Sequence, residues 1–426
     1  MSIRVYVFLN LLMLHIACST TSPTTLVVEN PSSPDKDNTA NKDNTALFDE
    51  IWATMQSQLY DRARADRWLT AENRDALRAR AAAAPDRLTF ARDVMNPFFD
   101  ELGVSHTRLF TSDVLGFYML RSLFHTRDIH SPTAVHIGVQ LTADHVIRSV
   151  FDGYPADLAG LRRGDQIVAV DGAPYVSLKQ LRPKRQRLRI RRGSELRSVA
   201  ITPVEDSPHE AMLRAMENSA AIEQRGGLRV GYVHLWTGTS PTILDSFTRI
   251  VTEQFRGVDA VILDLRGGFG GAWYDYIDPF YADRSDFFEF SITDRDGKTE
   301  QFKAEPKTNP NPYLGPLVVL IDEGTRSGKE ALAHQFGKKK RATVMGTTTW
   351  GAFTAGKGVF ADRNDVDYIL YLAVSEWRVD GRTMEGVGVA PEIGVPYPLD
   401  GTIAEDPQRA RAFEHAFALA SSNNTR

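Results

Sequence analysis

The chain has 426 residues, of which 42% are hydrophobic and 24% are charged. This length predicts two or three domains, and the composition is that of a globular protein rather than a disordered or fibrous one. A formal net charge of −4 gives no support for nucleic-acid binding. The single cysteine, Cys18, excludes an intramolecular disulfide, a thiolate zinc site and a thiol nucleophile in the folded body.

The first 18 residues predict an export signal. Arg4 gives a positive start, and the apolar run 5–14 is too short to span a bilayer comfortably. Cys18 then stands where a bacterial lipoprotein signal has its lipidated cysteine, although His15 replaces the usual leucine. We therefore expect lipidation at Cys18 and an extracytoplasmic, periplasm-facing protein anchored in a membrane. The alternative is ordinary signal cleavage nearby, which leaves no anchor.

Two segments precede the predicted domains that carry chemistry. Residues 19–46 are rich in Ser, Thr, Asn, Asp and Pro and repeat KDNTA, which predicts a disordered tether. Residues 47–133 form a predicted helical region, because apolar residues recur at helical spacing up to residue 102. Gly103 is a plausible helix end. The pair Ser105-His106 therefore lies on the loop that leaves this helix, where catalytic side chains can be presented.

Residues 134–204 resemble a PDZ domain. The pattern runs from AVHIGVQL through PADLAGLRRGDQIVAVDG to the strand-like SVAITPV. PDZ domains bind peptide C-termini by strand addition, with the carboxylate held by backbone amides of a glycine-containing loop. The resemblance places that loop at Ile137, Gly138 and Val139. The alternative is a PDZ domain that acts as a lid or spacer and binds nothing.

Residues 205–400 alternate strands with helical stretches, which indicates an α/β core. The apolar runs 228–236, 259–265, 316–321 and 368–374 are its expected strands. Residues 401–426 are expected to form a closing helix and tail.

Ser327 follows one of these strands and precedes a helical stretch, in GTRSGKE. A helix N-terminus favours negative charge, and the N–H of Gly328 is a natural donor to an oxyanion. The alternative role for Ser327 is a helix cap that forms a capping box with Glu330, and the two roles are compatible.

The run DLRGGFGG, residues 264–271, places four glycines after an apolar strand. Gly270 or Gly271 is the candidate for a second oxyanion donor. The alternative is a simple tight turn, and the glycine spacing does not fit a dinucleotide-binding fingerprint.

The order of these motifs, with RATVMGTTTWGA and GVGVAPEI after them, resembles peptidase family S41. This family contains the C-terminal processing peptidases and the tricorn-type peptidases. The resemblance implies a ClpP/crotonase-like α/β peptidase core, an inserted PDZ domain and serine-type hydrolysis of polypeptide substrates. No cofactor is expected, and the histidines lack the spacing of a metal site.

The two branches of the family use different bases. Processing peptidases pair the serine with a lysine, but the ungapped match places Ala352 at that position. Tricorn-type peptidases use an adjacent Ser-His pair, a later serine and a glutamate, which match Ser105-His106, Ser327 and Glu385. The resemblance thus implies Ser327 as nucleophile, His106 as base, and Glu385 acting through Ser105 or a water.

Two alternatives remain open from the sequence. If five residues are inserted, Lys357 matches the processing-peptidase lysine and becomes the base. The chain can also be read as a non-catalytic lipoprotein that binds peptides or other ligands on a peptidase fold.

Overall fold

The computed structural model describes residues 44–124, 132–361, 363 and 366–424. The predicted signal, Cys18 and nearly all of the predicted tether lie outside these residues. The last three residues of that tether, 44–46, are helical instead and form the start of the first helix. Within the described ranges, no helix has the length and apolar character needed to cross a membrane.

The N-terminal region is a set of short helices. They are α1 (Asn44–Gln58), α2 (Arg62–Trp68), α3 (Ala71–Ala83), α4 (Arg87–Thr89), the π-helical turn η1 (Phe90–Met95) and α5 (Asn96–Leu102). Gly103 ends α5 in the left-handed conformation, with φ 66°, as its position in the sequence predicts. The chain therefore turns sharply just before Ser105-His106.

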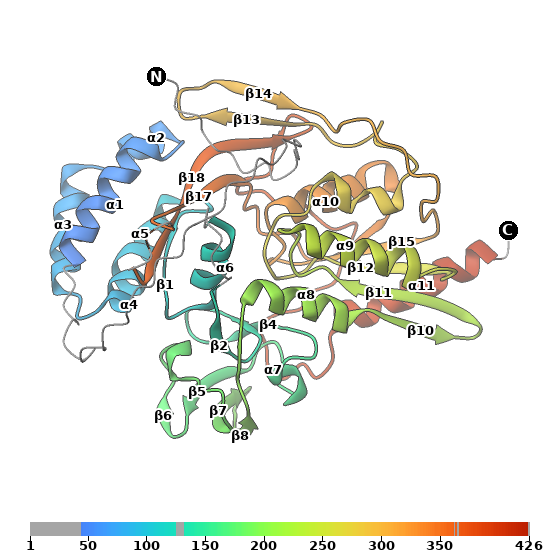
Figure 1. Ribbon diagram of the computed structural model, residues 1–426, viewed down its shortest axis with the longest axis horizontal. Coiled ribbons are helices and arrows are strands. Elements are labelled where there is room, and N and C mark those ends of the chain that lie inside the picture. Colours follow the sequence, from blue (N-terminus) through green and yellow to red (C-terminus); the bar gives the residue numbers. More distant parts are fainter. Residues whose placement is uncertain (1–43, 125–131, 362, 364–365, 425–426) are drawn as a thin grey trace, which may run out of the picture. The chain divides into compact units, whose positions relative to one another are not determined.

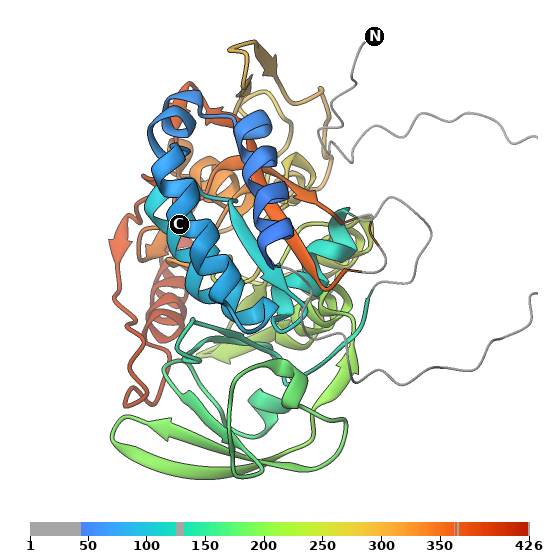
Figure 2. The same cartoon turned by 90° about the vertical axis from the view of Figure 1, so that its left-hand side faces the viewer.

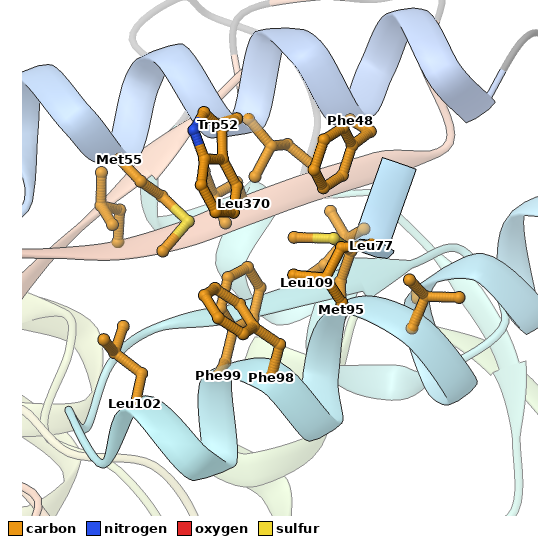
Figure 3. Close-up of a cluster of buried hydrophobic side chains, with 14 of the residues drawn as sticks. Phe48, Trp52, Met55, Leu77, Met95, Phe98, Phe99, Leu102, Leu109 and Leu370 are labelled. Atoms are coloured by element: carbon orange, nitrogen blue, oxygen red, sulfur yellow. The ribbon is translucent and has the colours of Figure 1, made fainter. Parts of the chain in front are cut away.

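These helices pack on a six-stranded sheet rather than forming a separate body. The sheet contains β1 (Arg108–Thr111), β13 (Phe290–Asp294), β14 (Thr299–Phe302), β17 (Thr354–Val359), β18 (Tyr368–Val379) and β19 (Arg382–Thr383). Buried aromatic residues of α1 and α5, including Trp52 and Phe98, meet Leu370 of β18 (Figure 3). Figure 2 shows the helices in front of this sheet. The predicted strand 368–374 is confirmed as part of β18, and it pairs with β1, β13 and β17 in this sheet.

A second sheet has the expected α/β character. Its strands are, in spatial order, β10 (Ala221–Arg225), β11 (Leu228–His234), β12 (Ala260–Asp264), β15 (Leu317–Ile321), β16 (Thr343–Gly346) and β20 (Ile393–Gly394). All pairs after β10–β11 are parallel. Every residue of β12 and β15 is buried, as in sheets covered on both faces. The carboxyl ends of these parallel strands share one edge, where ligands of α/β sheets bind.

Helices cover this sheet (Figure 1). They are α8 (Pro208–Ser219), α9 (Pro241–Arg249), α10 (Gly328–Gly337) and α11 (Pro407–Asn424), and α11 is the predicted closing helix. Phe413 and Phe417 of α11 pack on alternate residues of the central strands. Short helical turns η3 (Ile250–Gln254), η4 (Tyr274–Tyr276), η5 (Asp278–Phe280) and η6 (Lys338–Lys340) complete the region.

The PDZ-like region has its own buried core. Its elements are β2 (Ala134–His136), β3 (Val139–Leu141), β4 (Ile147–Val150), α7 (Pro155–Leu158), β5 (Gln166–Val170), β6 (Ala173–Pro174), η2 (Leu178–Gln180), β7 (Gln186–Arg192), β8 (Glu195–Ile201) and β9 (Val204–Asp206). β2 pairs with β9, so the region begins and ends at one place, as an inserted domain must. Leu115 and Tyr118 of α6 (Leu115–Phe124) pack against its core.

Candidate active site

Three of the four predicted catalytic residues form one chain of hydrogen bonds. The Ser105 hydroxyl donates to Glu385 Oε2 at 2.7 Å, and the Ser105 N–H donates to Glu385 Oε1 at 2.7 Å. Ser105 Oγ also lies 2.8 Å from His106 Nδ1. Glu385 comes from the loop after β19, 280 residues further along the chain. The fold therefore assembles a Glu-Ser-His relay from two distant loops.

This relay fixes the tautomer of His106. The Glu385 carboxylate can only accept hydrogen bonds, so the Ser105 hydroxyl donates its single hydrogen to that carboxylate. Ser105 Oγ must then accept from His106 Nδ1–H, which leaves the lone pair on Nε2. His106 thus presents the nitrogen that a general base requires.

The surroundings also keep His106 uncharged. Burial, with a smaller contribution from the nearby Arg326 guanidinium, lowers the pKa of His106 to about 3. At neutral pH the imidazole is therefore neutral and able to take a proton. The Tyr371 ring lies edge-on to it, with ring centroids 5.1 Å apart.

Thr354 and Gly356 of β17 complete the setting of His106, and neither was among the predicted site residues. Thr354 Oγ1 lies 3.2 Å from both Ser105 Oγ and His106 Nδ1. A Cβ on Gly356 would lie 2.9 Å from the His106 Cβ, so a side chain there would crowd the imidazole. Both lie within three residues of Lys357, the alternative base.

Ser327 occupies the strained turn between β15 and α10. Its φ of 55° and ψ of −132° are unusual for a residue with a side chain. Such strain concentrates at functional sites, and a serine on a strained strand-to-helix turn is the arrangement that exposes a nucleophilic hydroxyl. His106 has a positive φ as well, 55°.

Glu330 accepts more hydrogen bonds than the predicted capping box requires. Its carboxylate accepts from the Ser327 N–H, as in the predicted capping box, at 2.9 Å. It also accepts from Thr349 Oγ1 and from the N–H groups of Gly351 and Ala352. Burial raises the pKa of Glu330 to about 7. Glu330 therefore ties the loop 349–352 to the turn that carries Ser327.

The predicted oxyanion glycines lie beside Ser327. A Cβ on Gly270 would lie 3.1 Å from Ser327 Oγ, and one on Gly328 would lie 2.0 Å from the Gly271 carbonyl oxygen. Among the described residues, no protein acceptor takes the N–H groups of Gly270, Gly271 or Gly328. Gly268 has φ 67°, and a Cβ there would lie 1.9 Å from the Trp236 carbonyl oxygen, so a residue with a side chain does not fit.

Lys357 lies on the same strand as Gly356 but points the other way. Successive side chains of a strand face opposite sides, and the Gly356 side faces His106. The Lys357 side chain is exposed, and no described residue is hydrogen-bonded to it. Partial burial lowers the pKa of Lys357. This geometry favours His106 over Lys357 as the base.

The relay and Ser327 are connected through the backbone of residues 352 and 353. The Ser327 N–H donates to the Ala352 carbonyl at 3.0 Å, and the Phe353 N–H donates to Glu385 Oε2 at 2.8 Å. No hydrogen bond joins His106 to Ser327 in the described part of the chain. Catalytic hydrogen bonds are often long before substrate binds and tighten afterwards.

In the predicted carboxylate-binding loop of the PDZ-like region, one backbone amide already donates a hydrogen bond within the protein. Ile137 and Gly138 lie between β2 and β3, and Val139 begins β3. The Gly138 N–H donates to His136 Nδ1 at 3.1 Å, so that amide is already used.

As for metals, the described residues contain no group of three His, Cys, Asp or Glu side chains that could hold an ion.

Comparison with known proteins defines the class. Residues 229–395 match the family model of Peptidase family S41, and residues 146–192 match that of the PDZ domain. A carboxyl-terminal-processing protease of Synechocystis sp. is 29% identical over 205 residues, which cover 47% of each chain. Carboxyl-terminal-processing peptidase 2 of Arabidopsis thaliana is 29% identical over 273 residues, which cover 60% of this chain and 51% of that protein. This chain thus spans about half the length of the curated relatives it matches.

Solved structures agree on the fold. The photosystem II D1 C-terminal processing protease has a TM-score of 0.52 at 20% identity and covers 84% of this chain and 95% of its own. A CPAF s499a mutant has a TM-score of 0.52 at 14% identity and covers 89% of this chain and 96% of its own. The fold is that of a mixed α/β peptidase with a PDZ domain. Residues 229–395 are thus similar to peptidase family S41, and residues 146–192 to the PDZ domain.

The relay gives a first testable prediction, for Glu385→Gln. An amide has one acceptor oxygen, whereas the carboxylate accepts from Ser105 Oγ–H, Ser105 N–H and Phe353 N–H. His106 then loses its fixed tautomer, and we expect kcat on a fluorogenic peptide to fall by roughly 10²- to 10⁴-fold while the fold survives. Glu300→Gln, on an exposed strand, is the control and should stay near wild type. Equal effects of the two substitutions would contradict the relay.

Proposed function

We propose that the protein is a serine endopeptidase in which Ser327 is the nucleophile and His106 is the general base. The observation that carries this proposal is the Glu385–Ser105–His106 relay, which leaves a neutral imidazole with a free Nε2. The strained Ser327 at the carboxyl edge of the parallel sheet supplies the second half of the site.

In the proposed reaction, Ser327 Oγ attacks the peptide carbonyl carbon while its proton moves to His106 Nε2. The carbonyl oxygen becomes an oxyanion and accepts hydrogen bonds from the N–H of Gly328 and from Gly270 or Gly271. The C–N bond then breaks as His106 returns the proton to the leaving amine. Water, deprotonated by His106, then attacks the ester carbon, and the C–Oγ bond breaks as His106 returns that proton to Ser327 Oγ.

His106 and Ser327 are not hydrogen-bonded to each other in the described part of the chain, and this separation gives substrate binding a role. We propose that the described arrangement is a resting state, in which substrate draws the two residues into hydrogen-bond distance. The same separation is the observation that favours the alternative function, a peptide-binding protein on a peptidase fold. Hydrolysis of an unstructured peptide by the folded full-length protein supports the peptidase. Binding without hydrolysis, under conditions that saturate the protein with peptide, supports the alternative.

The names of the relatives support a substrate class. Carboxyl-terminal-processing proteases are named for action at protein C-termini. We propose that this protein cleaves unstructured C-terminal segments, which its PDZ domain recognises through Ile137, Gly138 and Val139. From the predicted export signal and Cys18 we also propose that this activity lies outside the cytoplasm on a membrane, and lipid analysis of the mature N-terminus tests that proposal.

The PDZ domain also contacts the catalytic turn directly. Gln140 of β3 accepts from the Gly268 N–H at 2.7 Å and donates to the Gly268 carbonyl at 3.1 Å. We therefore propose that the peptide-binding strand of the PDZ domain helps to hold the oxyanion turn.

Gln140→Ala tests this connection. Each lost hydrogen bond contributes about 0.5–1.5 kcal/mol, so kcat/KM is expected to fall about tenfold. Gln166→Ala is the matched control, because Gln166 is a PDZ glutamine that donates to the Asp144 carbonyl instead. Steady-state hydrolysis of one peptide by both variants gives the comparison. Unchanged hydrolysis by Gln140→Ala would show that the contact carries no catalytic coupling.

A further inference from the structure

A buried lysine lies beneath the proposed oxyanion turn. Lys329 is two residues after Ser327, and its side chain is fully buried, at 0% exposure. In the sequence it looks like an ordinary lysine in the first turn of a helix. No carboxylate is ion-paired with it in the described part of the chain. A lysine is almost never fully buried without a compensating set of partners.

Its partners are backbone carbonyls. Lys329 Nζ donates to Gly267 O at 2.6 Å, Leu235 O at 3.2 Å and Trp236 O at 3.3 Å, and lies 3.5 Å from Arg266 O. Residues 235–236 follow β11 and residues 266–267 follow β12. The ammonium group therefore joins the carboxyl ends of two neighbouring parallel strands to the helix that begins at the nucleophile.

Two of these carbonyls depend on the lysine. Arg266 O also accepts from His234 Nε2, and Trp236 O also accepts from the Phe269 N–H. Leu235 O and Gly267 O accept from no other described group. Without the ammonium group, both would be buried and unsatisfied at the point where the glycine turn starts.

We infer that Lys329 is a positioning residue for the proposed peptidase reaction, which holds the glycine turn 266–271 against Ser327 by collecting the carbonyls at its start. The inference rests on the proposed function. The turn that Lys329 anchors carries Gly270 and Gly271, and the Gly270 backbone lies against the Ser327 side chain. A turn that shifts away from Ser327 removes an oxyanion donor from where negative charge develops.

The charge state of Lys329 is consistent with this role. Burial lowers the pKa of Lys329 to about 7; Asp322 and Asp264 oppose the change and Arg326 adds to it. The surrounding carbonyl oxygens only accept hydrogen bonds. The ammonium form has three N–H donors and the neutral amine has two, so these oxygens favour the ammonium form.

The test compares Lys329→Met with a matched control in the full-length protein. Arg341 is also a cation that collects backbone carbonyls, those of Phe280, Tyr313 and Gly315, but at the amino ends of β15 and β16. Arg341→Met therefore removes a similar group from the opposite edge of the sheet. Thermal unfolding establishes that both variants fold, and each measurement is made well below the lower Tm.

Two readouts separate positioning from general destabilisation. For Lys329→Met we expect kcat on a peptide to fall about 10²-fold with KM nearly unchanged, and amide hydrogen exchange in residues 266–271 to accelerate at least about tenfold. For Arg341→Met we expect neither change. Wild-type exchange in the turn of Lys329→Met would overturn the inference, as would equal acceleration in Arg341→Met. Because exchange needs no catalysis, an inactive wild type would contradict the proposed function without affecting this test.

Discussion

Ser327→Ala is expected to lower kcat for peptide hydrolysis by roughly 10⁴- to 10⁶-fold, because it removes the atom that attacks the carbonyl. The protein should fold normally, since the Ser327 backbone keeps its N–H bonds to Ala352 and Glu330. Kinetics with one fluorogenic peptide and a thermal melt measure the two effects.

An exposed serine outside the proposed site provides the control for this loss. Ser285 lies in an exposed turn and contributes its backbone N–H to Asp283, so Ser285→Ala should hydrolyse peptide at the wild-type rate. If Ser327→Ala retained more than about a tenth of the wild-type kcat, another residue would have to be the nucleophile.

His106→Ala is expected to lower kcat by about 10⁴-fold, whereas Lys357→Ala should change it by no more than about twofold. The difference follows from geometry, because His106 completes the relay with Ser105 and Glu385, whereas Lys357 extends from the opposite side of β17 into solvent. The two variants are assayed side by side with the same peptide.

The same pair of variants also decides between the two branches of the family. Loss of hydrolysis in Lys357→Ala, with His106→Ala active, would assign a Ser-Lys mechanism and contradict the relay. Loss in His106→Ala alone supports the Ser-His mechanism.

The sequence predicted the elements that follow local rules. Gly103 as a helix end, the strands that lead to residues 264 and 321, and the closing helix all depend on nearby residues. The candidate residues Ser105-His106, Ser327 and Glu385 came from motif order, because nothing in their spacing indicates that residues 105 and 385 meet. The fold supplies that contact by pairing β1 with β18, next to the loop that carries Glu385.

What the sequence did not predict depends on burial by distant segments. The strand 368–374 is as apolar as the strands of the parallel sheet, so hydrophobicity alone could not assign it to another sheet. Lys329 and Glu330 have the charged character of an exposed first helical turn. They are buried because the loops after β11, β12 and β16 close over the start of α10. Thr354 acts through contacts with residues almost 250 positions away.

The most direct test of the central claim is covalent labelling of the folded protein with a fluorophosphonate, which reacts with activated serines, followed by mass spectrometry of the adduct. The account predicts one adduct, on Ser327, that is absent from Ser327→Ala, strongly slowed in His106→Ala and unchanged in Lys357→Ala. An unlabelled Ser327 in folded protein that hydrolyses peptide, or an adduct on a different serine, would contradict it.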